Sequence, residues 1–131
     1  MAAEESYPDE LLYHREHDWV RLDGGEATFG VTWYAQDALG DLVVFNPPEV
    51  GAAIAADSEY GELESVKAVS GVIAPLAGEV LEVNAAVVDG PEVVNDDPYG
   101  KVWLVRVKLT DPSAASALLS AADYRAYLST L

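Results

Sequence analysis

The chain has 131 residues, half of them apolar, which suits one domain with a single hydrophobic core. Its 23 acidic and 7 basic residues give a net charge of −16, so we expect neither nucleic acid nor an anionic membrane as a partner. The absence of cysteine excludes disulfides, thiolate metal sites and cysteine nucleophiles.

The sequence also predicts where the protein is found. No apolar stretch approaches the ~20 residues of a membrane-spanning helix. The acidic residues 1–8 have neither the basic and apolar regions of a secretory signal nor the arginines of a transit peptide. We therefore expect a soluble, monomeric protein of the bacterial cytoplasm, or of the mitochondrial matrix if the chain comes from a processed eukaryotic precursor.

Short strands separated by turns dominate the chain. Segments in which apolar and polar residues alternate are bounded by Gly, Pro, Asn and Asp, and no low-complexity linker interrupts them. This pattern predicts a mainly β fold, a small sandwich or flattened barrel with short helices and a helical C-terminus. We expect residues 1–12 to form an N-terminal extension and residues 13–131 to form a single domain.

Two strands and a short helix come first. Residues 19–22 and 26–31 flank Asp23-Gly24-Gly25, which is typical of a hairpin turn. The hydroxyl of Thr32 can cap a following helix, and Gly40 is a typical helix end. The helix is therefore predicted to follow the second strand of the hairpin directly.

A second hairpin is predicted in the middle of the chain. A buried strand over residues 42–45 ends at a pair of prolines, which lack the N–H that a strand ladder needs. Strands over residues 58–66 and 69–74 follow and are joined by a tight turn. The sequence Ala77-Gly78 then turns into a strand over residues 79–83.

The last strand and a helical segment complete the pattern. Apolar and polar residues alternate over residues 103–109. Asp111 can cap a helix whose first position is Pro112. Its apolar stripe is predicted to consist of Ala115, Leu118, Leu119 and Ala122, and a second turn or helix follows with Tyr124, Tyr127 and Leu128.

Lys67 is one of only three lysines and lies among acids, small residues and apolar residues. The neighbouring Val66 and Val69 are β-branched and favour strands that lead to an exposed turn. An amine on a long flexible stem can serve as a covalent tether for a carrier group. A solvated lysine on a hairpin turn is the plain alternative.

Four stretches of the chain together resemble the glycine cleavage system H protein family, and the resemblance runs from about Tyr13 to the C-terminus. They are His17-Asp-Trp-Val20, Tyr34-Ala-Gln-Asp-Ala-Leu-Gly40, Glu64-Ser-Val-Lys-Ala68 and Val94-Asn-Asp-Asp-Pro-Tyr-Gly100. Each stretch is weak alone, but their order and spacing together are highly specific.

The resemblance implies a lipoyl carrier with the fold of biotinyl and lipoyl carrier domains. In the family, lipoate is joined by an amide to the lysine that matches Lys67. The arm collects the aminomethyl group of glycine at a pyridoxal-phosphate glycine decarboxylase (P protein) and carries it to a folate-dependent aminomethyltransferase (T protein). Dihydrolipoyl dehydrogenase (L protein) then reoxidises the arm. The resemblance thus implies a carrier subunit and not an enzyme, because the chemistry belongs to the cofactor and the partner enzymes.

Four further residues gain roles from the resemblance. Glu64 and Gly78 match residues that lipoylating enzymes need; the plain alternatives are a solvated strand acid and an ordinary turn glycine. Asp18 and Glu16 match groups that face the cationic amine of the loaded arm in a surface cleft. The plain alternative for Asp18 is that it orients the strand before Trp19.

Three positions depart from the family pattern. Gly71 and Trp33 stand where the family usually has aspartate, and Lys101-Val102 replaces a small pair. Gly71 removes an acidic neighbour of the arm, so we expect a weaker hold on the loaded arm in this protein.

Other classes of function fit less well. A biotin carrier usually has methionines on both sides of its lysine, where this chain has Val66 and Ala68. A carrier that mainly relays lipoate to other enzymes and an acidic binding protein without a cofactor are further alternatives. A hydrolase is disfavoured because the chain has no nucleophile elbow and no Gly-rich phosphate loop. His14 and His17 are too few for a metal site, and we predict none.

Overall fold

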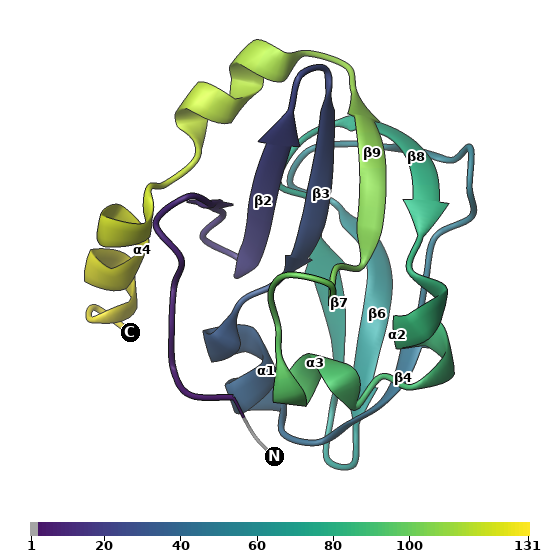
Figure 1. Ribbon diagram of the computed structural model, residues 1–131, viewed down its shortest axis with the longest axis vertical. Helices are drawn as coiled ribbons and strands as arrows, with labels where there is room; N and C mark the ends of the chain where they lie inside the picture. The colour runs from purple at the N-terminus through teal and green to yellow at the C-terminus, as the bar shows by residue number, and fades with distance from the viewer. Residues whose placement is uncertain (1–2) are drawn as a thin grey trace.

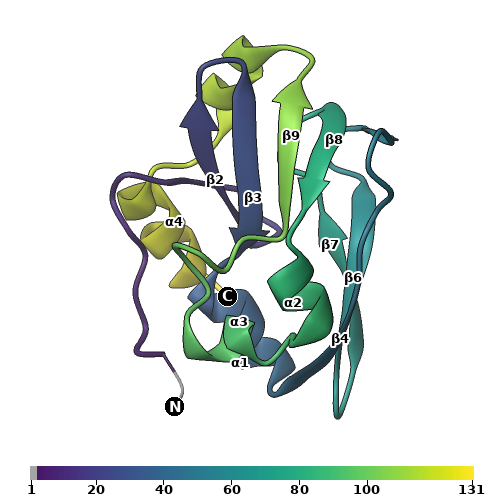
Figure 2. The ribbon, with the colours of Figure 1, turned by 45° about the vertical axis from the view of Figure 1, so that its right-hand side comes forward.

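Two antiparallel sheets pack face to face in the structure, a computed structural model that describes residues 3–131 (Figure 1, Figure 2). One sheet has six strands, in the order β1 (Leu12–Tyr13), β2 (Asp18–Asp23), β3 (Glu26–Val31), β9 (Val105–Leu109), β8 (Gly78–Val83) and β5 (Ala53–Ile54). The other has three strands, in the order β4 (Leu42–Asn46), β6 (Glu59–Ser65) and β7 (Val69–Ile73). The prediction of a mainly β sandwich is confirmed.

Short helices gather at one end and along one side of the sandwich (Figure 2). The end carries α1 (Trp33–Leu39), α2 (Ala85–Asp89) and α3 (Val93–Asp96). The C-terminal part forms a 3-10 helix, η1 (Pro112–Ala117), and α4 (Ala121–Leu128). Within residues 3–131, no helix is long and apolar enough to cross a membrane.

The hydrophobic core lies between the sheets. In β3, the alternate residues Ala27, Phe29 and Val31 are buried in it, as the period of two predicts. Leu63 and Val72 of the other sheet belong to the same buried cluster. Full burial of a side chain such as Phe29 or Leu63 stabilises the fold by about 1.5–3 kcal/mol.

Helix α1 has the limits that the sequence predicts. Thr32 is its N-cap, and the Thr32 hydroxyl accepts a hydrogen bond of 3.3 Å from the Ala35 N–H. Gly40 ends the helix with a φ of 84°, in the left-handed region that glycine adopts without strain. The Gly40 N–H donates to the Gln36 carbonyl oxygen. Both predicted caps are confirmed.

The C-terminal helical segment is split, and the predicted apolar stripe is wrong. Asp111 caps a helix as predicted, but this 3-10 helix ends at Ala117, and the backbone of Leu118 is extended. Leu119 then exchanges two backbone hydrogen bonds of 2.8 Å with Tyr13 of β1. This pairing with a strand takes Leu119 out of the helix, and Ser120 caps α4 as a separate second helix.

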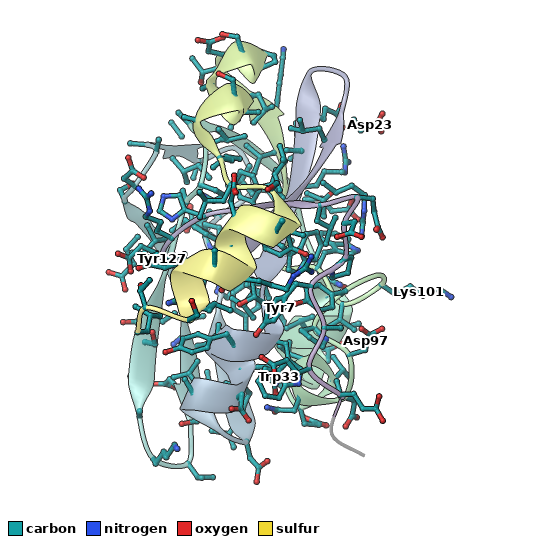
Figure 3. All side chains as sticks on the ribbon, turned by 90° about the vertical axis from the view of Figure 1, so that its left-hand side faces the viewer. Tyr7, Asp23, Trp33, Asp97, Lys101 and Tyr127 are labelled. Carbon is teal, nitrogen blue, oxygen red and sulfur yellow. The ribbon has the colours of Figure 1, made fainter. Side chains whose placement is uncertain are left out.

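An aromatic cluster fastens both ends of the chain to the sandwich. The Tyr13 and Tyr124 rings stack with their centroids 4.8 Å apart, and the Tyr7 ring packs edge-on against both. Figure 3 shows Tyr7 beside α4, and Arg125 Nη1 donates a hydrogen bond to the Tyr7 carbonyl oxygen. The segment expected as an extension therefore contributes Tyr7 and Leu11 to a second buried cluster.

Candidate functional site

Lys67 lies at the tip of the β6–β7 hairpin and is exposed, as predicted. Ser65 closes this turn. The Ser65 N–H donates to the Ala68 carbonyl oxygen at 2.8 Å, and the Ser65 hydroxyl oxygen accepts hydrogen bonds from the N–H groups of Lys67 and Ala68. Figure 1 shows the tip protruding at one end of the molecule. A short, internally bonded turn therefore presents the lysine amine.

The tip rests on the connection between α1 and β4. The Val66 N–H donates to the Asp41 carbonyl oxygen at 3.3 Å. The Lys67 side chain passes over Gly40, with Cε and Nζ 3.3 and 3.7 Å from the position that a Cβ on Gly40 would occupy. Because glycine has no side chain there, the lysine stem can lie against the end of α1.

The other two lysines have different surroundings. Lys101 follows α3 in a turn and projects away from the fold in Figure 3. Lys108 lies within β9, opposite Glu26 of β3 and Glu79 of β8. All three lysines are exposed, so it is the position at a hairpin tip that distinguishes Lys67.

Glu64 lies in β6, three residues before Lys67. It pairs with Val44 of β4 on one side and with Val69 of β7 on the other. Val69 is 58% exposed, and Val66 at the tip is 75% exposed. Glu64 and the exposed valines around it form a surface beside the lysine. A partner can recognise such a surface with a basic side chain placed against Glu64 and apolar side chains placed against the valines.

A groove with a volume of about 160 Å³ adjoins the hairpin. Its lining includes Tyr34, Ala35, Ala38 and Leu39 of α1 and Ser70, Gly71 and Val72 of β7. Glu16 and His17, which precede β2, and Asp18, the first residue of β2, also line it. The walls formed by α1 and β7 belong to elements that meet at Lys67. Strand β7 begins two residues after the lysine, and α1 ends beneath its side chain.

Asp18 is a buried acid of this groove. It is the first residue of β2 and only 1% exposed. Tyr60 of β6, in the other sheet, donates a hydrogen bond of 2.6 Å from its hydroxyl to Asp18 Oδ2. Burial raises the pKa of Asp18 well above its usual range, and the hydrogen bond from Tyr60 lowers it in part. The structure thus places an acid in the groove whose charge depends on its surroundings.

Glu16 is exposed and lines the groove near Asp18. The Glu16 N–H donates to His14 Nδ1 at 3.0 Å, so His14 Nε2 carries the proton that is donated to Asp57 at 2.6 Å. His17 Nδ1 bonds the Tyr124 hydroxyl at 2.7 Å, and burial lowers the pKa of His17. Both histidines therefore have protein partners. No group of three or more potential metal ligands occurs in residues 3–131.

Gly78 lies far from Lys67. It is the first residue of β8, which begins at the end of the molecule opposite the hairpin tip (Figure 1). Gly78 is buried between Ile54 of β5 and Leu109 of β9, and a Cβ there would clash with the Lys108 carbonyl oxygen. The prediction of a turn glycine is therefore wrong, because close strand packing explains this residue. Its recognition by lipoylating enzymes stays a prediction.

Two departures from the family pattern have visible counterparts in the structure. The Glu59 side chain fills the space that a Cβ on Gly71 would occupy, so a carboxylate from β6 lies next to that position. The Trp33 indole N–H donates to the Ala3 carbonyl oxygen at 2.8 Å. Trp33 therefore holds the N-terminal segment beside α1, as Figure 3 shows.

Sequence reasoning missed Tyr60, which is 42 residues from Asp18 in the chain. A tyrosine in a predicted strand is one signal, because its hydroxyl needs a hydrogen-bond partner once the ring is buried. The pattern does not reveal that partner, which comes from the opposite sheet.

Comparison with known proteins decides the family. A family model described as "Glycine cleavage H-protein" matches residues 11–131. The chain belongs to this family. The glycine cleavage system H proteins of Herpetosiphon aurantiacus and Bacteroides thetaiotaomicron are 51% and 46% identical to the chain, over 92% of its length and 92% and 96% of theirs. A crystal structure of a glycine cleavage system H protein from Mycobacterium marinum matches with a TM-score of 0.85 at 40% identity, covering 95% of this chain and 100% of that one. The resemblance found in the sequence is confirmed.

Proposed function

We propose that this protein is the lipoyl carrier of a glycine cleavage system, with lipoate joined to Lys67. Membership of the H protein family supports a role in the glycine cleavage system. The observation that supports Lys67 as the attachment site is its exposed position at a closed hairpin tip, beside a groove whose lining includes Asp18 and Glu16. Lipoate, when attached, supplies a dithiolane for group transfer and redox chemistry.

The surroundings of Lys67 fit a covalent arm. The tip protrudes, so a modifying enzyme can reach the amine, and the hydrogen bonds of Ser65 hold the turn in one conformation. Gly40 leaves space for the long lysine stem. Amide formation removes the positive charge of the amine, so the tip becomes more acidic once the arm is attached.

The groove fits the loaded end of the arm. Ala35, Ala38 and Leu39 give it an apolar wall, and Asp18 and Glu16 supply carboxylates that would attract a cationic amine. A carboxylate in a partly desolvated site attracts a cation more strongly than a fully exposed one. A cation beside Asp18 would in turn favour the charged form of its carboxyl group.

The face around Glu64 suits recognition by a lipoylating enzyme. Glu64 offers a carboxylate, and Val44 and Val69 on either side offer apolar contacts. A partner with a basic residue aimed at Glu64 would therefore be selected together with the lysine that follows it.

The partners in this proposal are glycine decarboxylase, aminomethyltransferase and dihydrolipoyl dehydrogenase, and the chain itself is their carrier and not a catalyst. A net charge of −16 favours encounter with basic surfaces on these enzymes. The relatives are bacterial, which supports the bacterial cytoplasm as the location.

Reconstitution tests the proposed function. The lipoylated protein, mixed with the three partner enzymes, their cofactors and glycine, should support glycine consumption. Lys67→Arg should abolish it because arginine presents no amine that can form the amide. Lys101→Arg is the matched control and should keep full activity. Equal glycine consumption with Lys67→Arg would overturn the proposal.

A further inference from the structure

The end of α1 and the residues after it form the base on which the hairpin tip rests. Gly40 lies beneath the Lys67 stem, and the Asp41 carbonyl oxygen accepts the hydrogen bond from the Val66 N–H. Helix α1 is also one wall of the groove. Whatever fixes the end of α1 therefore fixes both the attachment tip and the groove wall.

Asn95 of α3 contacts this base through both ends of its side-chain amide. Its Nδ2 donates to the Gly40 carbonyl oxygen and to Gln36 Oε1, both at 3.0 Å. Its Oδ1 accepts a hydrogen bond of 2.9 Å from the Leu42 N–H. The amide thus bonds the residues on both sides of Asp41. The Asp41 carbonyl oxygen is the group that accepts the hydrogen bond from the Val66 N–H at the hairpin tip.

The sequence motif over residues 94–100, which contains Asn95, also contacts the other end of α1 through Tyr99. The Tyr99 hydroxyl accepts a hydrogen bond of 3.0 Å from the Trp33 N–H and donates to the Ser6 carbonyl oxygen at 2.6 Å. Between the two ends, Gln36 Nε2 donates to the Trp33 carbonyl oxygen. Asn95 and Tyr99, two members of the sequence motif over residues 94–100, therefore hold α1 at both ends.

We propose that Asn95 is a positioning residue for the carrier arm: its side-chain amide sets the end of α1 and residues 40–42 where the Lys67 tip and the groove wall need them. The inference rests on the proposed function of the arm, although two of its readouts need no lipoate. The chemistry requires an amide, because the base offers two acceptors and one donor to this side chain. An aspartate would place a carboxylate oxygen against the Gly40 carbonyl oxygen and Gln36 Oε1.

Asn84 provides a matched control. Its side chain also makes three hydrogen bonds: it donates to the carbonyl oxygens of Lys101 and Trp103 and accepts from the Ala86 N–H. Asn84 caps α2, and its side-chain partners lie outside α1 and residues 40–42. Asn84→Ala should therefore lower stability without changing the Lys67 tip.

The test compares Asn95→Asp, Asn95→Ala and Asn84→Ala with the wild type. Hydrogen exchange of the Leu42 amide, followed by NMR in the unlipoylated protein, should be at least about tenfold faster in Asn95→Ala, which has no acceptor for the Leu42 N–H, and unchanged in Asn84→Ala. The rate at which an amine-reactive reagent modifies Lys67, read by peptide mass spectrometry, should change by at least about twofold in both Asn95 variants and stay unchanged in Asn84→Ala. The lipoylated, loaded Asn95 variants should lose the aminomethyl group at least about threefold faster without the transferase.

Unchanged Leu42 exchange in Asn95→Ala would overturn the proposal. So would faster exchange with Lys67 reactivity and aminomethyl release equal to those of Asn84→Ala, because Asn95 would then be structural only. Loss of folding in both Asn95 variants would also contradict it, since the residue would then support the whole fold. A folded wild type that never accepts lipoate would instead refute the proposed function, and Leu42 exchange and Lys67 reactivity would still decide the role of Asn95.

Discussion

The Tyr60 hydroxyl donates a hydrogen bond of 2.6 Å to Asp18, and this contact joins the two sheets at the groove. Both side chains are buried, and burial raises the pKa of each. A buried carboxyl group without a donor destabilises the folded state, because the interior replaces water poorly as a hydrogen-bonding solvent. An acid that lines the groove therefore depends on a tyrosine from the opposite sheet.

Tyr60→Phe should lower the free energy of unfolding by about 1–3 kcal/mol, because Asp18 stays buried and loses its donor. Urea denaturation measures the loss. The double variant with Asp18→Ala is the control: its loss should be smaller than the sum of the two single losses, since each substitution alone already removes the same hydrogen bond. Strictly additive losses would show that the two side chains do not stabilise each other.

Asp18→Asn should change how stability depends on pH. An ordinary aspartate has a pKa of about 4, and burial raises that of Asp18 in the folded state. Between these two pKa values the folded protein holds a proton that the unfolded chain has lost, so wild-type stability falls as pH rises through this window. Asparagine has no such proton. Urea denaturation at several pH values from about pH 4 to pH 8 should therefore show that the unfolding free energy of the Asn variant rises relative to that of the wild type as pH rises.

The opposite trend, in which the unfolding free energy of the wild type rises relative to that of Asp18→Asn as pH rises, would mean that the fold stabilises Asp18 as a carboxylate. Lipoylation of Lys67 serves as the control measurement and should be the same in both proteins, because Asp18 is buried at the groove and not at the hairpin tip.

Glu64→Ala should slow lipoylation at least about tenfold, as expected for loss of one charge-assisted contact with the modifying enzyme. Its unfolding free energy should stay within about 0.5 kcal/mol of the wild type, because Glu64 has no buried partner to lose. Glu62→Ala is the matched control, since Glu62 lies in the same strand two residues farther from Lys67. Equal lipoylation rates for all three proteins would remove Glu64 from the recognition surface.

Gly78→Ala should lower the free energy of unfolding by about 1–3 kcal/mol, because the added Cβ meets the backbone of β9. Gly25→Ala is the control, since a Cβ at Gly25 meets no atom within 4 Å. Thermal or urea unfolding separates the two. If the folded Gly78→Ala protein is lipoylated at the wild-type rate, Gly78 is a packing residue. A slower rate at unchanged stability would instead favour recognition.

Local chemistry made much of the attachment site predictable. The β-branched residues on either side of Lys67 indicated two strands and a turn, and the structure places the lysine at that turn. Thr32 and Gly40 marked the limits of α1 because capping depends on residues within one helical turn. These features are local in the chain, and so the sequence pattern contains them.

The features that were missed depend on contacts between distant segments. Asn95 is 53 residues from Leu42, and no local pattern indicates that its amide reaches the base of the hairpin. The predicted apolar stripe failed at Leu119 because this residue pairs with Tyr13, a strand contact that outweighs local helix preference. Gly78 was taken for a turn residue because the approach of β9 is visible only in the folded sheet.

The central claim of this account is that Lys67 carries lipoate, and peptide mass spectrometry tests it most directly. Protein produced with lipoate and a lipoylating enzyme should show the added mass of one lipoyl amide on the peptide that contains Lys67. Peptides with Lys101 or Lys108 should be unmodified, and Lys67→Arg should acquire no lipoate. Lipoate on the Lys67→Arg protein, or on Lys101 or Lys108 while Lys67 stays unmodified, would contradict the account.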